Sequence, residues 1–139
     1  MRIVLDTNIL ISALMSPVSA SAQLLTLWRS RKIVVVTTPQ QIEEIARVTR
    51  YAKIRAQLVP ALAGRLVNRL RGVAIVVDKL PDLDIAPDPD DNYLLALAEA
   101  SQADFLVTGD KGLLSLHQHK STRMITPAAL IESLKAVRE

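Results

Sequence analysis

The sequence contains no cysteine, few aromatic residues and no long apolar run. Without cysteine there is no disulfide, no thiolate metal site and no cysteine nucleophile, and such a composition fits a reducing compartment. Aromatic residues make up 3% of the chain and apolar residues 50%, so we expect an aliphatic core. No apolar stretch approaches the ~20 residues that cross a bilayer, and the N-terminus lacks the regions of a signal peptide. We therefore expect a cytoplasmic protein without a membrane segment.

The length of 139 residues predicts one domain over residues 1–139. Seventeen Lys and Arg residues against 14 Asp and Glu residues give a net charge of +3, which is compatible with a polyanionic partner. The charges are unevenly distributed along the chain. Basic residues concentrate between Arg47 and Arg71, and acidic residues concentrate between Asp78 and Asp91. An acidic concentration within a basic protein requires a specific explanation.

Short, largely apolar runs alternate with segments of helical periodicity. The runs are Ile3–Leu5, Ile33–Val36, Val73–Val77, Ala103–Val107 and Met124–Ile125. Consecutive apolar residues suit strands that are buried on both faces, as in a parallel sheet. Thr38, Pro39 and Gln41 have the spacing of a capping box with an early proline, which predicts a helix start. The order predicts a three-layer α/β/α fold around a parallel sheet of four to five strands.

This pattern places four acidic residues near one edge of the sheet. Asp6 and Asp110 each follow the carboxyl end of a strand, where open α/β sheets bind ligands. Asp91 falls in the first turn of a helix, and Glu44 falls at the edge of the apolar stripe of another. A structural role is equally open for Asp6, because Asp is a good helix cap, and for Glu44, because a Glu at the rim can reach water. One Asp suffices to cap a helix, so Asp88, Asp90 and Asp91 together favour a cation site.

Several carboxylates at close range repel one another and require a cation. An all-oxygen ligand set, with no cysteine and no convincing histidine cluster, favours Mg²⁺ or Mn²⁺ over zinc. Such a site suits phosphoryl chemistry, because metal ions can activate water and bind the phosphate. The sequence has no glycine-rich phosphate loop, which argues against the use of nucleoside triphosphates.

Four blocks of sequence resemble, in this order, the signature blocks of PIN domains. They are Leu5-Asp6-Thr7-Asn8, Ile42-Glu43-Glu44-Ile45, Asp88-Pro89-Asp90-Asp91-Asn92 followed by Leu94, Ala96 and Ala98, and Leu106-Val107-Thr108-Gly109-Asp110-Lys111. Within that family, the blocks resemble those of the prokaryotic VapC-like branch, the toxins of toxin–antitoxin pairs. The resemblance extends over essentially the whole chain, from the first strand to the last helix.

The resemblance implies a Mg²⁺- or Mn²⁺-dependent endoribonuclease that hydrolyses RNA phosphodiester bonds with a metal-activated water. Carried over by position, the catalytic and metal-binding acids are Asp6, Glu44, Asp91 and Asp110, and the supporting polar residues are Asn8 and Thr108. The resemblance also implies an antitoxin protein as a partner and a homodimer or higher homo-oligomer.

Five basic residues are candidates for holding the RNA backbone. They are Arg50, Lys53, Arg65, Arg69 and Lys111. Arg65 and Arg69 lie one turn apart on a polar helix face, which suits either a solvated surface or a phosphate-binding patch.

One position departs from the family pattern. Many PIN domains carry a further acid two positions after the residue matching Asp110, and here that position is Gly112. Either that acid is dispensable, or Asp88 or Asp90 compensates, or a second metal binds weakly. The alternative function is a catalytically weak or degenerate PIN-like domain that binds RNA or a protein partner. A receiver-like or phosphatase domain is disfavoured, because the segment after the first strand supplies neither an acidic pair nor an Asp-x-Asp motif.

Overall fold

Strands and helices alternate along residues 1–138, the part of the chain that this computed structural model describes. The strands are β1 (Arg2–Leu5), β2 (Val34–Thr37), β3 (Ile75–Val76), β4 (Phe105–Val107), β5 (Gln118–His119) and β6 (Thr122–Ile125). The helices are α1 (Thr7–Met15), α2 (Ala20–Arg29), α3 (Pro39–Val48), α4 (Ala52–Arg55), α5 (Pro60–Gly72), the 3₁₀ helix η1 (Pro89–Asp91), α6 (Asn92–Ser101), α7 (Lys111–Ser115) and α8 (Pro127–Arg138). Glu139, the last residue of the predicted domain, lies outside the described residues.

The strands form one sheet in the order β3-β2-β1-β4-β6-β5. All neighbouring pairs are parallel except the pair of β5 and β6. The predicted α/β fold with a central parallel sheet is confirmed, and the two-residue strand β5 brings the sheet to six strands. Leu5 of β1 is paired in register with Val107 of β4. The residues that follow these two strands therefore emerge side by side at one edge of the sheet.

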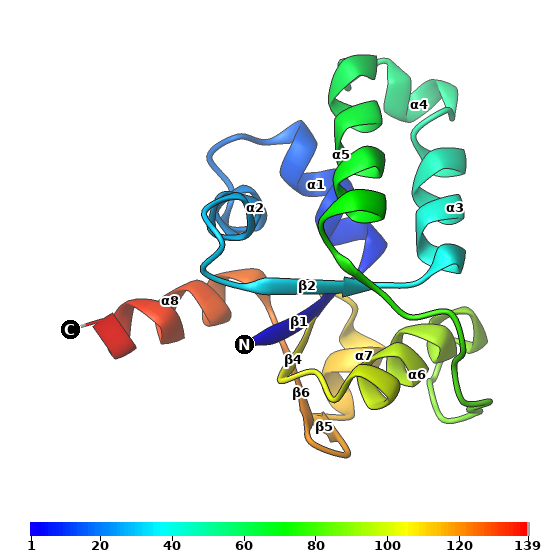
Figure 1. The fold of residues 1–139 in the computed structure, drawn as a ribbon, viewed down its shortest axis with the longest axis vertical. Helices are drawn as coiled ribbons and strands as arrows, with labels where there is room; N and C mark the ends of the chain where they lie inside the picture. The colour runs from blue at the N-terminus through cyan, green and yellow to red at the C-terminus, as the bar shows by residue number, and fades with distance from the viewer. Residues whose placement is uncertain (139) are drawn as a thin grey trace.

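Helices cover both faces of the sheet (Figure 1). α1, α2, α3, α5 and α8 contribute to a core on one face with Ile3, Leu5 and Val35. α6 and α7 contribute to a second core with Val4 and Val36. This division follows from the strand period of two, which directs successive side chains to opposite faces. Both cores are built mainly from aliphatic side chains, as the composition predicts.

The third strand is shorter and more exposed than the sequence predicts. The run Val73–Val77 is typical of a buried strand, but only Ile75–Val76 forms β3. β3 lies at the edge of the sheet and both of its residues are exposed. A β-branched apolar run fits a pleated surface in general, so it does not distinguish an edge strand from a central one.

The predicted capping box at the start of α3 is absent. Thr38 occupies the N-cap position, but its side chain makes no capping hydrogen bond. Gln41 is fully buried, and its side-chain amide donates to the Leu5 carbonyl at 2.6 Å. Its side-chain carbonyl accepts a hydrogen bond from the Thr37 hydroxyl, also at 2.6 Å. Gln41 therefore attaches the start of α3 to the end of β1.

The apolar helices α1 and α2 are separated by a sharp turn. The Ser19 hydroxyl caps α2 by accepting a hydrogen bond from the Ala22 N–H at 3.1 Å. Within residues 1–138, no single helix has the length and apolar character needed to cross a bilayer. Only α1 and α2 taken together reach this length and apolar character, and the two helices are bent by 96° at the break between them.

Candidate active site

Asp6 lies directly after the central strand β1 and takes the helix-capping role that the sequence leaves open for it. Its side chain caps α1, accepting a hydrogen bond from the Asn8 backbone N–H at 3.3 Å. Its other carboxylate oxygen accepts a hydrogen bond from the Thr108 hydroxyl at 2.7 Å. Asp6 is 8% exposed, and burial is the main reason that its pKa is raised above the ordinary value. Asn8 contributes its backbone N–H to Asp6, and its side chain is exposed.

Thr108 connects two of the four acids. Its hydroxyl donates to Asp6 and accepts a hydrogen bond from the backbone N–H of Asp110 at 3.0 Å. Asp110 follows at the N-cap of α7, where one of its oxygens accepts from the Leu113 N–H at 2.9 Å. Because Thr108 is fully buried, its hydroxyl fixes the carboxylate of Asp6 and the backbone of Asp110 relative to each other.

Asp91 lies near Asp6 and Asp110, at the end of the segment between β3 and α6 (residues 77–91), which we call the acidic connection. Its side chain makes no capping hydrogen bond, although it occupies the N-cap position of α6. Its pKa is raised from 3.8 to about 6, first by burial and then by the negative charges of Asp6, Asp110, Asp88 and Asp90. A carboxylate that caps nothing and lies among like charges has no evident structural role.

Asn92 holds the acidic connection in place. Its side-chain carbonyl accepts hydrogen bonds from the backbone N–H groups of Ile85 and Ala86, at 2.9 and 2.8 Å. Its side-chain amide donates to the Pro89 carbonyl at 3.1 Å. These three bonds restrain the segment that carries Asp88, Asp90 and Asp91 against the start of α6.

Glu44 points towards the site from α3, and Tyr93 of α6 orients it. The Tyr93 hydroxyl donates to a Glu44 carboxylate oxygen at 3.3 Å and lies 3.3 Å from the Thr7 hydroxyl. The ring is nearly buried. Burial and the charges of Glu44 and Asp6 raise the pKa of the Tyr93 hydroxyl, so it remains a protonated donor. Neighbouring Glu43 is exposed, so Glu44 is the inward-facing member of the pair.

The four acids form one electrostatic cluster centred on Asp6. The charges of Glu44 and Asp110 raise the pKa of Asp6, and the charges of Asp6 and Asp110 raise the pKa of Asp91. Neither of the two ion pairs found among residues 1–138 involves any of these acids. α3 begins at the arrowhead end of β2, and α6 and its preceding connection lie on the other side of the sheet at that end (Figure 1).

The donor chemistry of this cluster fits a hard divalent cation. All four candidate ligands are carboxylates, which Mg²⁺ and Mn²⁺ prefer, and uncompensated negative charge favours cation binding. The side chains are not already drawn together, since no group of three His, Cys, Asp or Glu residues in the described chain has the spacing of a metal site. Asp6, Glu44, Asp91 and Asp110 are therefore the residues that could hold such an ion.

Gly112, at the position where the resemblance leads us to expect an acid, lies in close contact with the acidic connection. A Cβ atom at this position would approach an Asp110 carboxylate oxygen to 3.1 Å and the Pro87 ring to 3.3 Å. Glycine therefore allows Pro87 to lie against the start of α7. A larger residue here would have to displace either the Asp110 carboxylate or the connection.

Sequence reasoning missed two residues that organise this site. Gln41 lies on the same helical stripe as Ile45, a periodicity that predicts burial and that the capping interpretation overlooked. Tyr93 begins a helix that is apolar nearly all round, and nothing in its sequence context distinguishes its hydroxyl from a core ring with a solvent-exposed tip. Its role depends on α3 and α6 meeting at the sheet edge.

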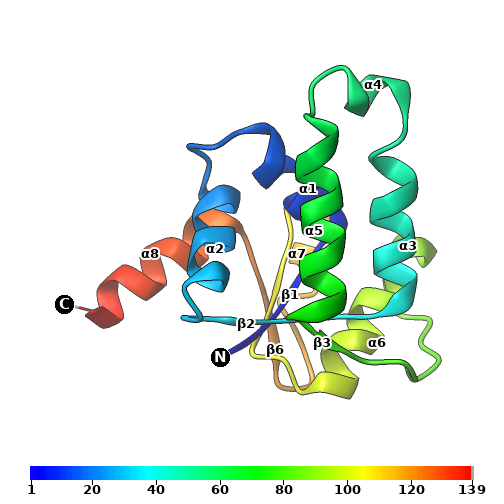
Figure 2. The ribbon, with the colours of Figure 1, turned by 45° about the horizontal axis from the view of Figure 1, so that its top comes forward.

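The candidate RNA-binding residues do not all lie together. Lys111 is exposed and follows Asp110 directly. Arg65 and Arg69 line a pocket between α1, α2 and α5. Arg50 and Lys53 are exposed near α4, which lies at the end of α3 and α5 remote from the sheet (Figure 2). Among the five, Lys111 is thus the closest in sequence to the acidic cluster.

The fold and the acidic cluster define an α/β protein with carboxylates gathered at the carboxyl end of a parallel sheet. The family model of the PIN domain matches residues 2–112. The Uncharacterized protein MJ1680 of Methanocaldococcus jannaschii is 31% identical over 116 residues, which cover 83% of this chain and 74% of that protein. A human structure described as "Structure of PIN domain of human SMG5" has a TM-score of 0.49 and 12% identity, covering 96% of this chain and 99% of that chain. The chain belongs to the PIN domain family.

Membership of this family sets the general class of the protein. PIN domains are usually nucleases, and they typically use divalent metal ions. Membership therefore supports a nuclease acting on RNA or another nucleic acid.

Proposed function

We propose that this chain is a Mg²⁺- or Mn²⁺-dependent endoribonuclease whose metal-binding acids are Asp6, Glu44, Asp91 and Asp110. The observation that carries the proposal is the electrostatic coupling of these four acids through Asp6, with no cationic side chain of residues 1–136 paired to any of them. Such an arrangement is costly in the absence of a cation. A divalent cation held there would supply Lewis-acid activation of water and of the scissile phosphate.

The chain's own residues prepare this site. The Thr108 hydroxyl holds one Asp6 oxygen, and the Asn8 backbone N–H holds the other. The Tyr93 hydroxyl restrains Glu44. Asp6 and Glu44, which these hydrogen bonds already restrain, lose less freedom when the cation binds, as in metal sites whose ligands are oriented by surrounding hydrogen bonds. Lys111, beside Asp110, is placed to attract the RNA backbone.

A specific observation favours a second candidate function, an RNA- or protein-binding domain with weak or no turnover. The space beside Gly112 is occupied by Pro87 and by the Asp110 carboxylate, so no side chain replaces the acid that many relatives carry there. Asp88 and Asp90 lie in the same connection and are the alternatives for that role. This candidate predicts RNA binding without metal-dependent cleavage.

The experiment that tests the proposal is cleavage of a labelled, mixed-sequence, single-stranded RNA with Mn²⁺, with Mg²⁺ and with EDTA. Wild-type protein is expected to cleave only with metal, and the Asp6→Asn variant is expected to retain the fold and lose cleavage. The exposed Asp84→Asn variant is the matched control and is expected to cleave like wild type. Cleavage in EDTA, or cleavage by Asp6→Asn, would refute the assignment. A gel shift without cleavage by wild type would favour the binding domain.

The resemblance of the motif blocks to the VapC-like branch extends the proposal to the cellular role. In that role the protein is a cytoplasmic toxin, an antitoxin protein inhibits it, and it acts as a homodimer or higher homo-oligomer. Growth arrest on expression of wild type, and its absence with Asp6→Asn, is the expected result. Normal growth with a cleavage-competent wild-type protein would contradict the toxin role and leave the nuclease assignment intact.

A further inference from the structure

A pocket lies between α1, α2 and α5, outside the acidic cluster. Its volume is about 300 Å³, near the lower end of small-ligand sites. Leu14 of α1, Leu25 and Trp28 of α2 and two leucines of α5 supply its apolar wall. Asp6 caps the start of α1 and Leu14 lies near its end, so eight residues of helix separate them by about 12 Å. The pocket is therefore distinct from the candidate active site but on the same face of the sheet.

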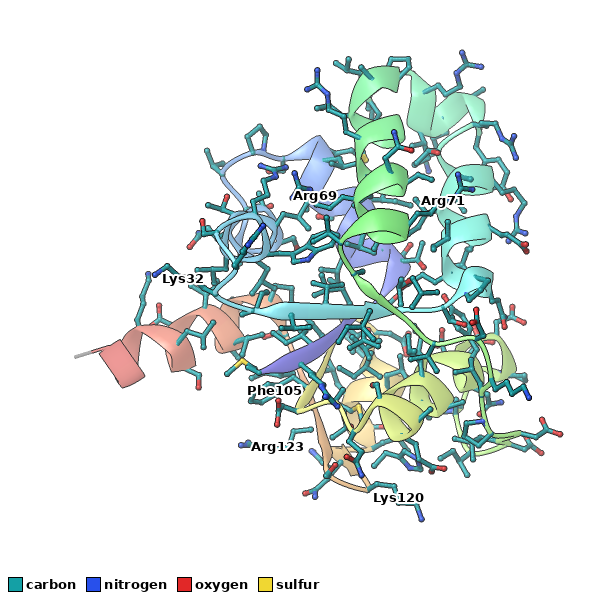
Figure 3. The ribbon with its side chains drawn as sticks, in the orientation of Figure 1. Lys32, Arg69, Arg71, Phe105, Lys120 and Arg123 are labelled. Carbon is teal, nitrogen blue, oxygen red and sulfur yellow. The ribbon has the colours of Figure 1, made fainter. Side chains whose placement is uncertain are left out.

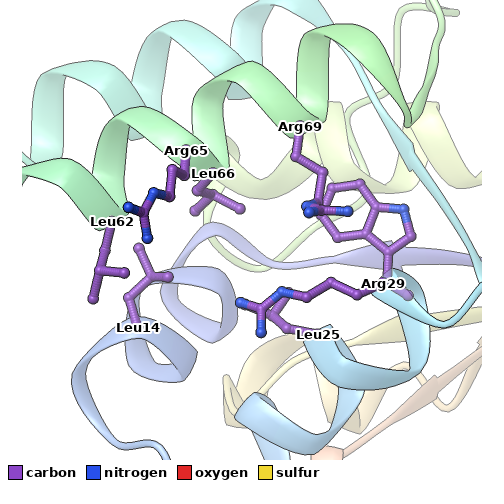
Figure 4. A pocket seen from close by; sticks show the side chains of 8 residues that line it. Leu14, Leu25, Arg29, Leu62, Arg65, Leu66 and Arg69 are labelled. Atoms are coloured by element: carbon purple, nitrogen blue, oxygen red, sulfur yellow. The ribbon is translucent and has the colours of Figure 1, made fainter.

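Three arginines surround the opening of this pocket. Arg29 comes from α2, and Arg65 and Arg69 come from α5. The side chains of Arg29 and Arg65 extend from opposite sides over the same opening (Figure 4). α1, α2, α4 and α5 contain no Asp or Glu, and no ion pair in the described residues involves these arginines. Guanidinium groups gathered in this way favour an anionic ligand.

Arg69 gives the pocket a flat, cationic surface. Its guanidinium carbon lies 5.6 Å from the centroid of the Trp28 ring, a cation–π contact. The indole is almost fully buried, so it orders Arg69 rather than offering its own face to a ligand. A guanidinium plane packed on a ring can stack a nucleobase on its other side. The neighbouring leucines can cover the part of the nucleobase that Arg69 does not contact.

We infer that this pocket binds one nucleotide of an RNA strand. The phosphate contacts Arg29 and Arg65, and the base stacks against Arg69 and the leucine wall. Guanidinium groups match phosphate geometry bidentately, and a flat base fits the Arg69 plane better than the side chains of an acidic peptide do. The inference rests on the proposed function only in taking RNA as the natural source of the nucleotide.

The single tryptophan of the chain reports on this pocket without requiring cleavage. Wild-type protein in EDTA is titrated with AMP, adenosine, inorganic phosphate and a single-stranded RNA nonamer, and Trp28 fluorescence is followed. We expect saturable binding of AMP, at least about tenfold weaker binding of adenosine and of phosphate, and tighter binding of the nonamer, because each arginine contact to phosphate is a charge-assisted hydrogen bond. AMP binding without competition from the nonamer would overturn the assignment to RNA.

Arg65→Gln and Arg29→Gln are expected to weaken AMP binding about tenfold each. Both residues are exposed, so the variants should fold, which a thermal melt verifies. The matched control is Arg71→Gln. Arg71 lies on the same helix as Arg69 but on the opposite side (Figure 3), and its variant should bind AMP within about twofold of wild type. Unchanged AMP affinity in Arg65→Gln would overturn the inference.

Two further arms separate this inference from its alternatives. A short peptide that alternates Asp and Leu is titrated in parallel. Binding of that peptide but not of AMP, lost in Arg65→Gln, would make the pocket a protein-docking site and overturn the nucleotide assignment. Asp6→Asn is expected to bind AMP like wild type. If wild-type protein binds AMP but does not cleave RNA, the result counts against the proposed nuclease alone. If it cleaves RNA but does not bind AMP, the result counts against the nucleotide pocket alone.

Discussion

Replacing Asp91 by Asn removes a carboxylate that the other acids destabilise. Asp91 has its pKa raised from 3.8 to about 6, so the folded protein binds the Asp91 proton more tightly than the unfolded chain does. Folding is therefore most favoured at low pH with respect to this group, and the stabilisation is lost as the pH rises through the folded-state value. At pH 7.5 Asp91 is ionised, and its charge lowers the free energy of unfolding of wild-type protein by the full amount. The Asn variant does not carry this penalty.

The size of this penalty follows from the shift. A change from 3.8 to about 6 corresponds to about 3 kcal/mol of unfolding free energy, at about 1.4 kcal/mol for each pKa unit. Asp91 is only partly buried, so solvent screening reduces the expected effect to about 1 kcal/mol. For a domain of this length, 1 kcal/mol shifts the melting temperature by about 3 °C. At pH 4.5 about a third of the penalty should remain.

The assay is thermal unfolding of wild type and Asp91→Asn in EDTA at pH 4.5 and 7.5, and again at pH 7.5 with Mn²⁺. In EDTA at pH 7.5, Asp91→Asn should melt about 3 °C above wild type, with a smaller difference at pH 4.5. Mn²⁺ should stabilise wild type more than the variant, because an ion that binds only the folded state raises its stability. The control Asp84→Asn should show neither effect. Equal melting of wild type and Asp91→Asn in EDTA, or equal stabilisation of both by Mn²⁺, would refute the reasoning.

Two further substitutions test the hydrogen bonds around the site. Tyr93→Phe removes the hydroxyl that contacts Thr7 and Glu44, and it should lower the cleavage rate about tenfold while changing the unfolding free energy by less than about 1 kcal/mol. An unchanged rate in a cleavage-competent background would show that Glu44 does not depend on this contact. Gln41→Leu leaves the buried Leu5 carbonyl without its donor and a buried hydroxyl without its acceptor. It should destabilise the protein by about 2–4 kcal/mol in urea unfolding, and a loss below about 1 kcal/mol would contradict the role of Gln41 as a structural link.

The approach of the four acids could be predicted because topology, not side-chain detail, determines it. A parallel sheet brings the ends of β1 and β4 together, so Asp6 and Asp110 had to share an edge. Glu44 faces inward as its position beside the apolar stripe of α3 predicts, and Asp91 lies where the acidic connection meets α6. None of these inferences requires a distance.

The parts that could not be predicted depend on contacts between distant segments. Tyr93 reaches Glu44 only because α6 begins at the same edge of the sheet as α3. The position of Gln41 in the sequence fits both a capping residue and a core residue of α3. The contact that decides between these two roles is made with Leu5, which is 36 residues away. The exposure of β3 depends on the absence of a seventh strand beside it in residues 1–138, which its apolar composition does not encode.

The electrical charge of the chain is divided between its two faces. Residues 1–77 and α8, which supply the helices on one face, contain 13 Lys and Arg residues and four Asp and Glu residues, whereas residues 78–126 contain four and nine. The molecule therefore has a dipole that runs from the α6 side of the sheet towards the α1–α5 side. A polyanion would be rotated by this field before contact, so that its backbone meets the positive helices first. Because the Debye length falls to about 8 Å at physiological salt, this alignment would act mainly over the last approach and would weaken steeply as salt rises.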